Sequence, residues 1–190
     1  MGKSKAATYL SERRMLVVDT DDLAREVVAV GSSGLAAVAA EFGPAVIGSN
    51  GELLRGELAR IVFADAAARR RLESITHPLI LRRWREIAEK WRQEGREAGV
   101  VVIPLLFETQ AEQEFESVIC IACGSERQSA RLHTRGWTAE QVAGRLAAQW
   151  PIETKMERSQ YVVWNDSDVS VLREQLGRIP PLKGRQYLPP

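Results

Sequence analysis

The chain has 190 residues, 45% of them hydrophobic and 27% charged, and its 26 Lys and Arg against 25 Asp and Glu leave a formal net charge of +1. This balance predicts a globular domain with a sizeable core, and it argues against a nucleic-acid binder, which needs a basic excess for its phosphate contacts. No apolar run approaches the ~18 residues of a membrane span, the first ten residues lack the apolar stretch of a signal peptide, and two cysteines provide no disulfide framework. We therefore expect a cytoplasmic protein that binds neither nucleic acid nor membranes.

Short apolar runs alternate with helical patterns along the chain, which is typical of an α/β domain with a mostly parallel sheet. The apolar runs predict strands at 15–18, 100–103, 117–121 and 161–164. The helical patterns predict helices over 6–13, 57–63, 79–97 and 138–149. Thr76 is the expected N-cap of the third of these helices, with Pro78 in its first turn, and residues 179–190 are expected to form a proline-rich tail.

Gly2-Lys3-Ser4 stands at the start of the first predicted helix. This tripeptide is the second half of a phosphate-binding loop, in which the Lys ammonium meets the β- and γ-phosphates and the Ser hydroxyl binds Mg²⁺. The free N–H groups at a helix start also favour an anion. A frayed terminus is the alternative interpretation of so short a motif.

Three acidic residues, Asp19, Asp21 and Asp22, follow the first predicted strand. They would lie at the carboxyl end of the sheet, where open α/β sheets bind their ligands. Carboxylates there can hold Mg²⁺ or take a proton from an attacking hydroxyl. We expect Asp22 to be the N-cap of the next helix, whereas capping alone does not explain Asp19 and Asp21.

Cys120 and Cys123 have the Cys-x-x-Cys spacing of redox and zinc sites. Structural zinc needs two more ligands, which no neighbouring His or Cys supplies. Residues three apart on a strand also point to opposite faces. We expect both cysteines to be core residues.

Several segments, in matching order, resemble the dephospho-coenzyme A kinases over residues 2–177. Gly2-Lys3-Ser4 is similar to the end of that family's phosphate loop, and residues 19–25 to its Asp-x-Asp segment. Residues 61–65 and 71–79 resemble its middle region, and Ile103-Pro-Leu-Leu-Phe-Glu108 resembles its strand-end motif. Residues 161–165 resemble the segment with its adenine-side Asn. The positions that resemble its lid are Arg131, Arg135, Gly136, Arg145 and Gln149.

The resemblance implies an α/β fold of the P-loop NTPase type, with a parallel sheet flanked by helices. It places one kinase domain at residues 1–178, with a helical substrate lobe at about 50–98 and a lid at about 125–160. The implied reaction transfers the γ-phosphoryl group of ATP, with Mg²⁺, to the ribose 3′-hydroxyl of dephospho-CoA. We expect the protein to be a monomer.

The resemblance also implies roles for individual residues. Residues expected to bind ATP are Gly2, Lys3, Ser4, Arg135, Arg145 and Asn165, and those expected to hold Mg²⁺ are Ser4 and Asp19. The expected catalytic residues are Lys3, Asp21, Arg131 and Arg135. Among these, Asp21 is the base or orienter of the hydroxyl, and the two arginines, four residues apart on one helix face, neutralise developing charge.

The acceptor substrate is expected to contact a further set of side chains: Asp19, Asp21, Arg25, His77, Arg82, Phe107 and Glu108. An arginine suits the pyrophosphate of dephospho-CoA. A solvated surface is the alternative interpretation of the arginines, and a structural or core role is the alternative for His77 and Phe107.

The sequence departs from the family pattern at four places. The first strand and the first half of the phosphate loop are missing, so we expect Met1 to be an internal methionine of a longer chain and the present chain to be marginally stable. Val102 and Trp164 each stand where the family commonly has an acidic residue, and the Asp usual between Arg135 and Gly136 is missing.

Two alternative functions remain at the level of sequence. Another small-molecule or nucleotide kinase would share the loop and the lid but phosphorylate a different hydroxyl. A catalytically impaired homologue would bind a nucleotide without turning it over.

Overall fold

A computed structural model describes residues 1–134, 136, 138, 142–144, 146 and 149–180. The chain forms two compact units. Unit 1 comprises Met1–Val17 and Val102–Pro190, and unit 2 comprises Val18–Val101. Over the described residues the strands form two two-stranded sheets, in which β1 (Leu16–Asp19) pairs with β2 (Gly99–Val102) and β3 (Ile119–Ala122) pairs with β4 (Tyr161–Trp164).

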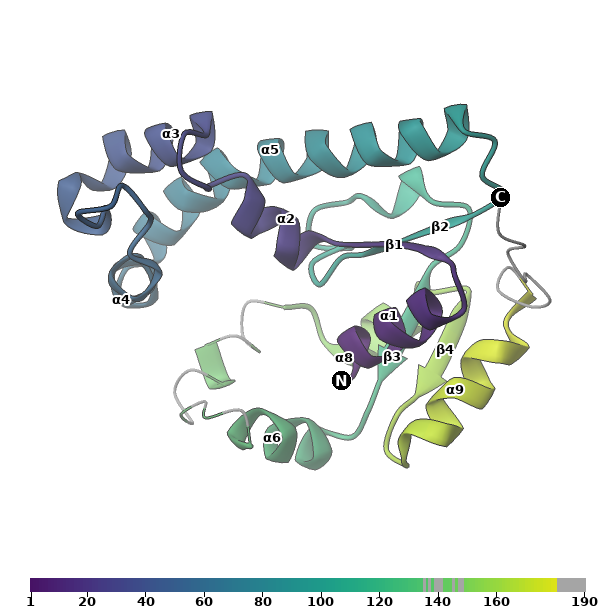
Figure 1. The fold of residues 1–190 in the computed structure, drawn as a ribbon. Coiled ribbons are helices and arrows are strands. Elements are labelled where there is room, and N and C mark those ends of the chain that lie inside the picture. The colour runs from purple at the N-terminus through teal and green to yellow at the C-terminus, as the bar shows by residue number, and fades with distance from the viewer. Residues whose placement is uncertain (135, 137, 139–141, 145, 147–148, 181–190) are drawn as a thin grey trace. The chain divides into compact units, whose positions relative to one another are not determined.

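Unit 1 is built around the parallel pair β3 and β4, in which Ile119 is opposite Tyr161 and Ala122 is opposite Trp164. The helices of this unit whose bounds are described include α1 (Lys3–Glu12), α6 (Ser125–His133), α8 (Ile152–Glu157) and α9 (Val169–Arg178), with the short 3-10 helix η2 (Glu112–Glu114). Figure 1 shows α9 running beside β4 and α1, and both contacts are direct.

Helices α1 and α9 form a compact pair. Each buries two residues four positions apart, which places both on one helix face: Ala6 and Leu10 on α1, Leu172 and Leu176 on α9. Polar contacts at the surface join the same two helices, because Arg173 on α9 lies 2.9 Å from the Glu12 carboxylate.

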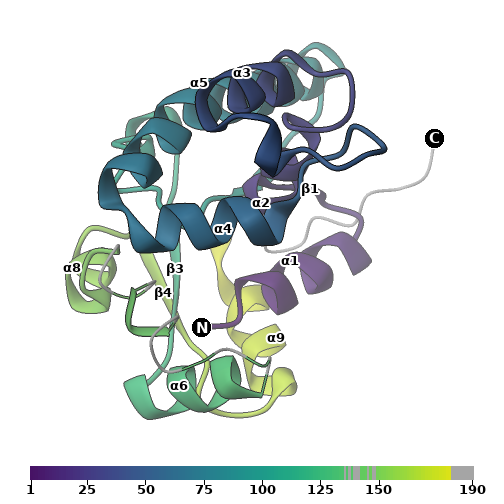
Figure 2. The same ribbon diagram turned by 90° about the vertical axis from the view of Figure 1, so that its left-hand side faces the viewer.

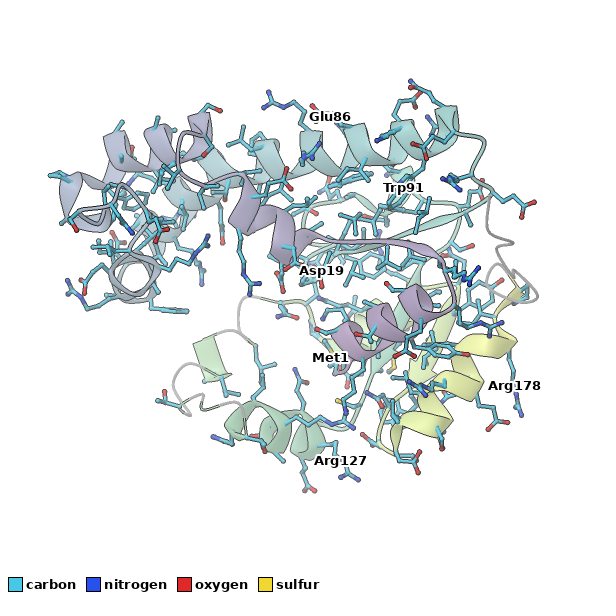
Figure 3. All side chains as sticks on the ribbon, viewed as in Figure 1. Met1, Asp19, Glu86, Trp91, Arg127 and Arg178 are labelled. Atoms are coloured by element: carbon cyan, nitrogen blue, oxygen red, sulfur yellow. The ribbon has the colours of Figure 1, made fainter. Side chains whose placement is uncertain are left out.

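Unit 2 consists mainly of helices α2 (Thr20–Glu26), α3 (Ser33–Phe42), α4 (Arg55–Ala64) and α5 (Ala66–Gln93), with the 3-10 helix η1 (Pro44–Val46). Figure 2 shows α3, α4 and α5 gathered together. Their core consists of the buried side chains Val28, Val38, Val46 and Leu58. Figure 3 shows Glu86 and Trp91 on opposite sides of α5, and Gly99 lies so close to the Trp91 ring that a Cβ there would come within 2.3 Å of it.

The four predicted strands are confirmed within two residues at each end, and the parallel pairing of β3 with β4 confirms the α/β class. The predicted helices over 6–13 and 57–63 correspond to α1 and α4. Half of the residues in the predicted helix over 138–149 lie outside the described ranges, and the structure assigns helix to 142–144 and 146. Among the helices of those ranges, none has both the length and the apolar character that crossing a bilayer would require.

The predicted start of the longest helix is wrong. Helix α5 begins at Ala66, capped by the Asp65 side chain, which accepts from the Ala67 N–H at 2.7 Å, and Pro78 lies inside the helix instead of in its first turn. Proline removes one helical hydrogen bond. The helix continues through it because Leu72 and Ile75, on the turns before the proline, pack against the core of unit 2.

Candidate active site

The start of α1 in unit 1 has the local geometry of an anion site. Gly2 is the N-cap of α1 with φ 111°, a left-handed conformation that glycine adopts without strain. Gly2 has no side chain that could cap the helix, and the first N–H groups of an α-helix have no partner within the helix itself. Lys3 and Ser4 are the first two helical residues, as a phosphate-binding helix start requires.

Asn165 lies directly against this helix start. The residue follows β4, is 4% exposed, and donates from Nδ2 to the Met1 carbonyl at 2.7 Å. A Cβ on Gly2 would come within 2.0 Å of the same Nδ2 atom. The structure therefore brings together four of the residues expected to bind ATP: Gly2, Lys3, Ser4 and Asn165.

The Met1 amino group, labelled in Figure 3, precedes the start of α1. Burial lowers the pKa of the Met1 amino group, and the charges of Lys3 and Arg131 lower it further, while the Cys123 thiol opposes them. One guanidinium nitrogen of Arg131, Nη1, is buried and has no hydrogen-bond partner among the described residues. A buried donor in this state is costly unless a ligand satisfies it.

A cavity of about 540 Å³ opens at the start of α6. Its lining residues are Gly124, Ser125, Glu126, Arg127, Ala130 and Asp166. The Asp166 carboxylate forms part of the wall and is held in place, because Oδ1 accepts from the Gly124 N–H at 2.9 Å and Oδ2 accepts from the Trp164 indole N–H at 3.0 Å. The cavity has the size of a small-ligand site and is adjacent in the chain to Asn165.

Unit 2 places the acidic residues in one tight turn. Asp19 ends β1 and is the N-cap of α2, accepting from the Asp21 N–H at 2.9 Å, so the prediction that Asp22 is the cap is wrong. The helix starts earlier because Thr20 is already helical and buried. Asp22 instead pairs with Arg25 at 3.1 Å, and the exposed Asp21 carboxylate makes no hydrogen bond or ion pair within the described residues.

The other expected acceptor residues of unit 2 are spread over two helices. Arg25 lies at the end of α2, whereas the half-buried His77 and the exposed Arg82 belong to α5. Arg82 lies 3.7 Å from Glu86 on its own helix. Sequence reasoning missed Arg55, the first residue of α4, which donates to the Arg25 carbonyl at 3.4 Å; its position after the Asn50-Gly51 turn was the available signal.

Phe107 and Glu108, in unit 1, are held inside a cluster of aromatic and charged side chains. Phe107 is 3% exposed and stacks on Trp150 with ring centroids 6.3 Å apart, and the Arg158 guanidinium lies over both rings. Glu108 Oε1 accepts from Lys155 Nζ at 2.6 Å and from the Trp150 N–H at 2.8 Å. These contacts hold both side chains in place within unit 1.

Lys155 is the second residue that sequence reasoning missed. It is 7% exposed and also donates to the Pro104 carbonyl at 3.3 Å. No sequence signal distinguishes it from an ordinary surface lysine, because it lies in a short helix with charged neighbours.

The cysteines are buried and not disulfide-bonded, which confirms the prediction that they are core residues. Burial raises the pKa of the Cys120 thiol, against the opposing charges of Lys155 and Lys3. In the described part of the chain, no group of three His, Cys, Asp or Glu is placed to hold a metal ion. Arg135 and Arg145, which are expected to bind ATP, lie outside the described residues.

Known proteins similar to this chain agree on one family. The dephospho-CoA kinase family profile matches residues 1–170. A dephospho-CoA kinase of Bdellovibrio bacteriovorus is 37% identical over 178 residues, covering 94% of this chain and 89% of that protein. One of Synechococcus elongatus is 40% identical and covers 92% of this chain and 84% of its own length.

Solved structures show the same relationship in three dimensions. A Thermus thermophilus protein of known crystal structure superposes with a TM-score of 0.74 at 31% identity, covering 92% of this chain and 87% of that one. The dephospho-CoA kinase of Campylobacter jejuni gives 0.67 at 25% identity with the same coverage. The fold is that of a P-loop kinase. Within that class the chain belongs to the dephospho-CoA kinase family.

Proposed function

We propose that this chain transfers the γ-phosphoryl group of ATP to the ribose 3′-hydroxyl of dephospho-CoA, giving CoA and ADP. The observation that carries the proposal is the start of α1, where Gly2 in a left-handed conformation is followed by Lys3 and Ser4 in a member of this family. The expected monomeric state, cytoplasmic setting and boundaries of the lobe and lid stay predictions.

The nucleotide is proposed to bind through residues of unit 1. The N–H groups at the start of α1 and the Lys3 ammonium hold phosphate oxygens. Asn165 fills the space beside Gly2, so only glycine fits between this side chain and the helix start. The cavity beside Asp166 supports binding of the nucleoside part.

The residues also include suitable donors for Mg²⁺, which prefers oxygen ligands. Ser4 offers an exposed hydroxyl, and Asp19 offers a carboxylate at the end of β1. When bound, Mg²⁺ would neutralise charge on the transferred phosphoryl group. Ser4 and Asp19 are therefore proposed as its protein ligands.

Unit 2 is proposed to bind and activate the acceptor. In the transfer, the 3′-oxygen forms a bond to the γ-phosphorus, the bond between that phosphorus and the β,γ-bridging oxygen breaks, and the hydroxyl proton passes to the Asp21 carboxylate. Arg25, Arg55, His77 and Arg82 are proposed to contact the anionic parts of dephospho-CoA.

The test is ADP release by the purified chain with MgATP and one acceptor at a time. We expect release with dephospho-CoA, and little with CoA, whose 3′-position already carries a phosphate, or with nucleosides and nucleoside monophosphates. Equal release with several other acceptors would favour a different small-molecule kinase. Binding of MgATP without release with any acceptor would favour a nucleotide-binding homologue.

Arg131→Ala should lower kcat/KM by about 100-fold, since one preorganised donor to developing charge is typically worth that much. Stability should change by less than ~0.5 kcal/mol because the variant removes no hydrogen bond of the buried nitrogen. The measurements are steady-state kinetics and urea unfolding, with the exposed α9 residue Arg178→Ala as a matched control. Unaltered kinetics in Arg131→Ala would show that Arg131 takes no part in the reaction.

A further inference from the structure

We propose that Gln175, on α9, is a positioning residue for the nucleotide site: its side-chain amide fixes the end of β4 and thereby aims Asn165 at the start of α1. This inference rests on the proposed use of that helix start by ATP. Gln175 is half-buried and touches none of the residues assigned to substrate, so it acts through another residue.

The amide of Gln175 pairs with the backbone as a neighbouring strand would. Its Oε1 accepts from the Trp164 N–H at 2.9 Å, and its Nε2 donates to the Trp164 carbonyl at 2.9 Å. The backbone N–H and C=O of one strand residue point to the same side of the strand. Within the described residues β4 pairs with β3 alone, so Gln175 satisfies the last residue of its outer edge.

The opposite side of the same segment is held by β3. The Asn165 N–H, one residue further along, donates to the Ala122 carbonyl at 2.8 Å. Two consecutive residues are therefore fixed from opposite sides, Trp164 by a side chain of α9 and Asn165 by the backbone of β3. With its backbone held in this way, the Asn165 side chain donates from Nδ2 to the Met1 carbonyl.

Helix α9 is itself attached to the helix whose start binds the phosphates. Arg173, two residues before Gln175, pairs with Glu12 on α1, and its guanidinium lies 5.5 Å from the centroid of the Tyr9 ring. The contacts thus form a closed path within unit 1, from α1 to α9, through Gln175 to the end of β4, and through Asn165 back to the start of α1. Loosening Gln175 opens this path one residue before Asn165.

A positioning role and a merely structural role differ in what they do to the kinetics. If Gln175 only stabilised the fold, its loss would lower the active fraction and the unfolding midpoint, and both KM values would stay the same. If it aims Asn165, its loss weakens ATP binding while kcat and the KM for dephospho-CoA stay near those of the unsubstituted chain, because the acceptor residues belong to unit 2.

The experiment compares Gln175→Ala, Gln175→Glu and the control Glu174→Ala, which removes only an exposed pair with Arg178 on the same turn. The Kd of MgATP is measured by calorimetry, together with kcat and both KM values. We expect Gln175→Ala to raise the Kd and the KM for ATP about fivefold to tenfold, the scale of one to two hydrogen bonds, with kcat within about twofold. Gln175→Glu keeps the side-chain size and the bond from the Trp164 N–H but sets a carboxylate against the Trp164 carbonyl, so it should weaken ATP binding at least as much.

Three results would overturn the proposal. The first is an ATP Kd in both Gln175 variants that stays within about twofold of the unsubstituted chain. The second is an equal rise in both KM values, and the third is an equal loss in Glu174→Ala. Calorimetry measures ATP binding without turnover, so it tests the positioning role independently of the proposed reaction. A chain that binds MgATP, loses affinity in Gln175→Ala and phosphorylates no dephospho-CoA would refute the reaction and support the positioning role.

Discussion

Asp21→Asn should lower kcat for phosphorylation of dephospho-CoA by 100-fold or more, while the Kd for MgATP stays within about twofold of the unsubstituted chain. A positioned general base typically contributes ~10²–10⁴-fold to a rate. Asparagine keeps the shape of the side chain but cannot accept the hydroxyl proton. ATP binding is unaffected because the proposed nucleotide residues lie in unit 1, whereas Asp21 lies in the first turn of α2 in unit 2.

The substitution should leave the fold intact. The Asp21 carboxylate is exposed and makes no hydrogen bond or ion pair among the described residues, and the contact that closes the turn uses its backbone N–H, which asparagine retains. Loss of one negative charge from the first turn of a helix costs about 0.3–1 kcal/mol. Circular dichroism and urea unfolding should therefore show a folded variant.

Asp22→Asn is a matched control, since it removes the same charge from the same helical turn. Asp22 is exposed and pairs with Arg25, so its loss should change kcat by no more than about threefold, the scale of a surface ion pair. Turnover of Asp21→Asn equal to that of the unsubstituted chain would remove Asp21 from the mechanism. A similar large loss in Asp22→Asn would assign the effect to the charge of the turn instead of to one carboxylate.

The sequence alone predicts those elements that a short contiguous run of residues encodes. The runs Leu16–Asp19 and Tyr161–Trp164 are apolar segments of strand length, and the structure places strands there. Gly2-Lys3-Ser4 was recognisable because only a few residue types suit a helix start that binds phosphate. The family resemblance predicted Asn165 as a residue of the nucleotide site. Its contact with the Met1 carbonyl joins the end of β4 to the start of α1.

The features that sequence reasoning missed depend on partners distant in the chain. Proline favours the first turn of a helix, so Pro78 predicts a helix start. In the structure it lies inside α5, because the preceding turns of this helix pack against the core of unit 2. Asp19 and Asp22 are equally good caps in isolation, and the burial of Thr20 decides between them. Gln175 is an unremarkable helical glutamine until β4 is seen to lie beside α9.

Lys155→Met should destabilise the protein by about 3–5 kcal/mol, because it removes one partner of a buried ion pair and leaves the other charge without compensation. The Lys155 and Glu108 side chains are 9% and 13% exposed, and the second carboxylate oxygen of Glu108, Oε2, is already buried without a hydrogen-bond partner among the described residues. That loss is a large part of the ~5–15 kcal/mol that stabilises a typical domain. Urea unfolding followed by circular dichroism measures it.

The double variant Lys155→Met/Glu108→Gln separates loss of the pair from isolation of its charge. It should recover part of the lost stability, because the remaining amide needs only hydrogen bonds and can still accept from the Trp150 N–H. Lys90→Met is the matched control on α5, where an exposed lysine lies 3.8 Å from Glu94, and it should cost less than ~0.5 kcal/mol. If Lys155→Met unfolds at the same urea concentration as Lys90→Met, the pair contributes no more than a surface contact, and Glu108 would again be available as a direct ligand of the substrate.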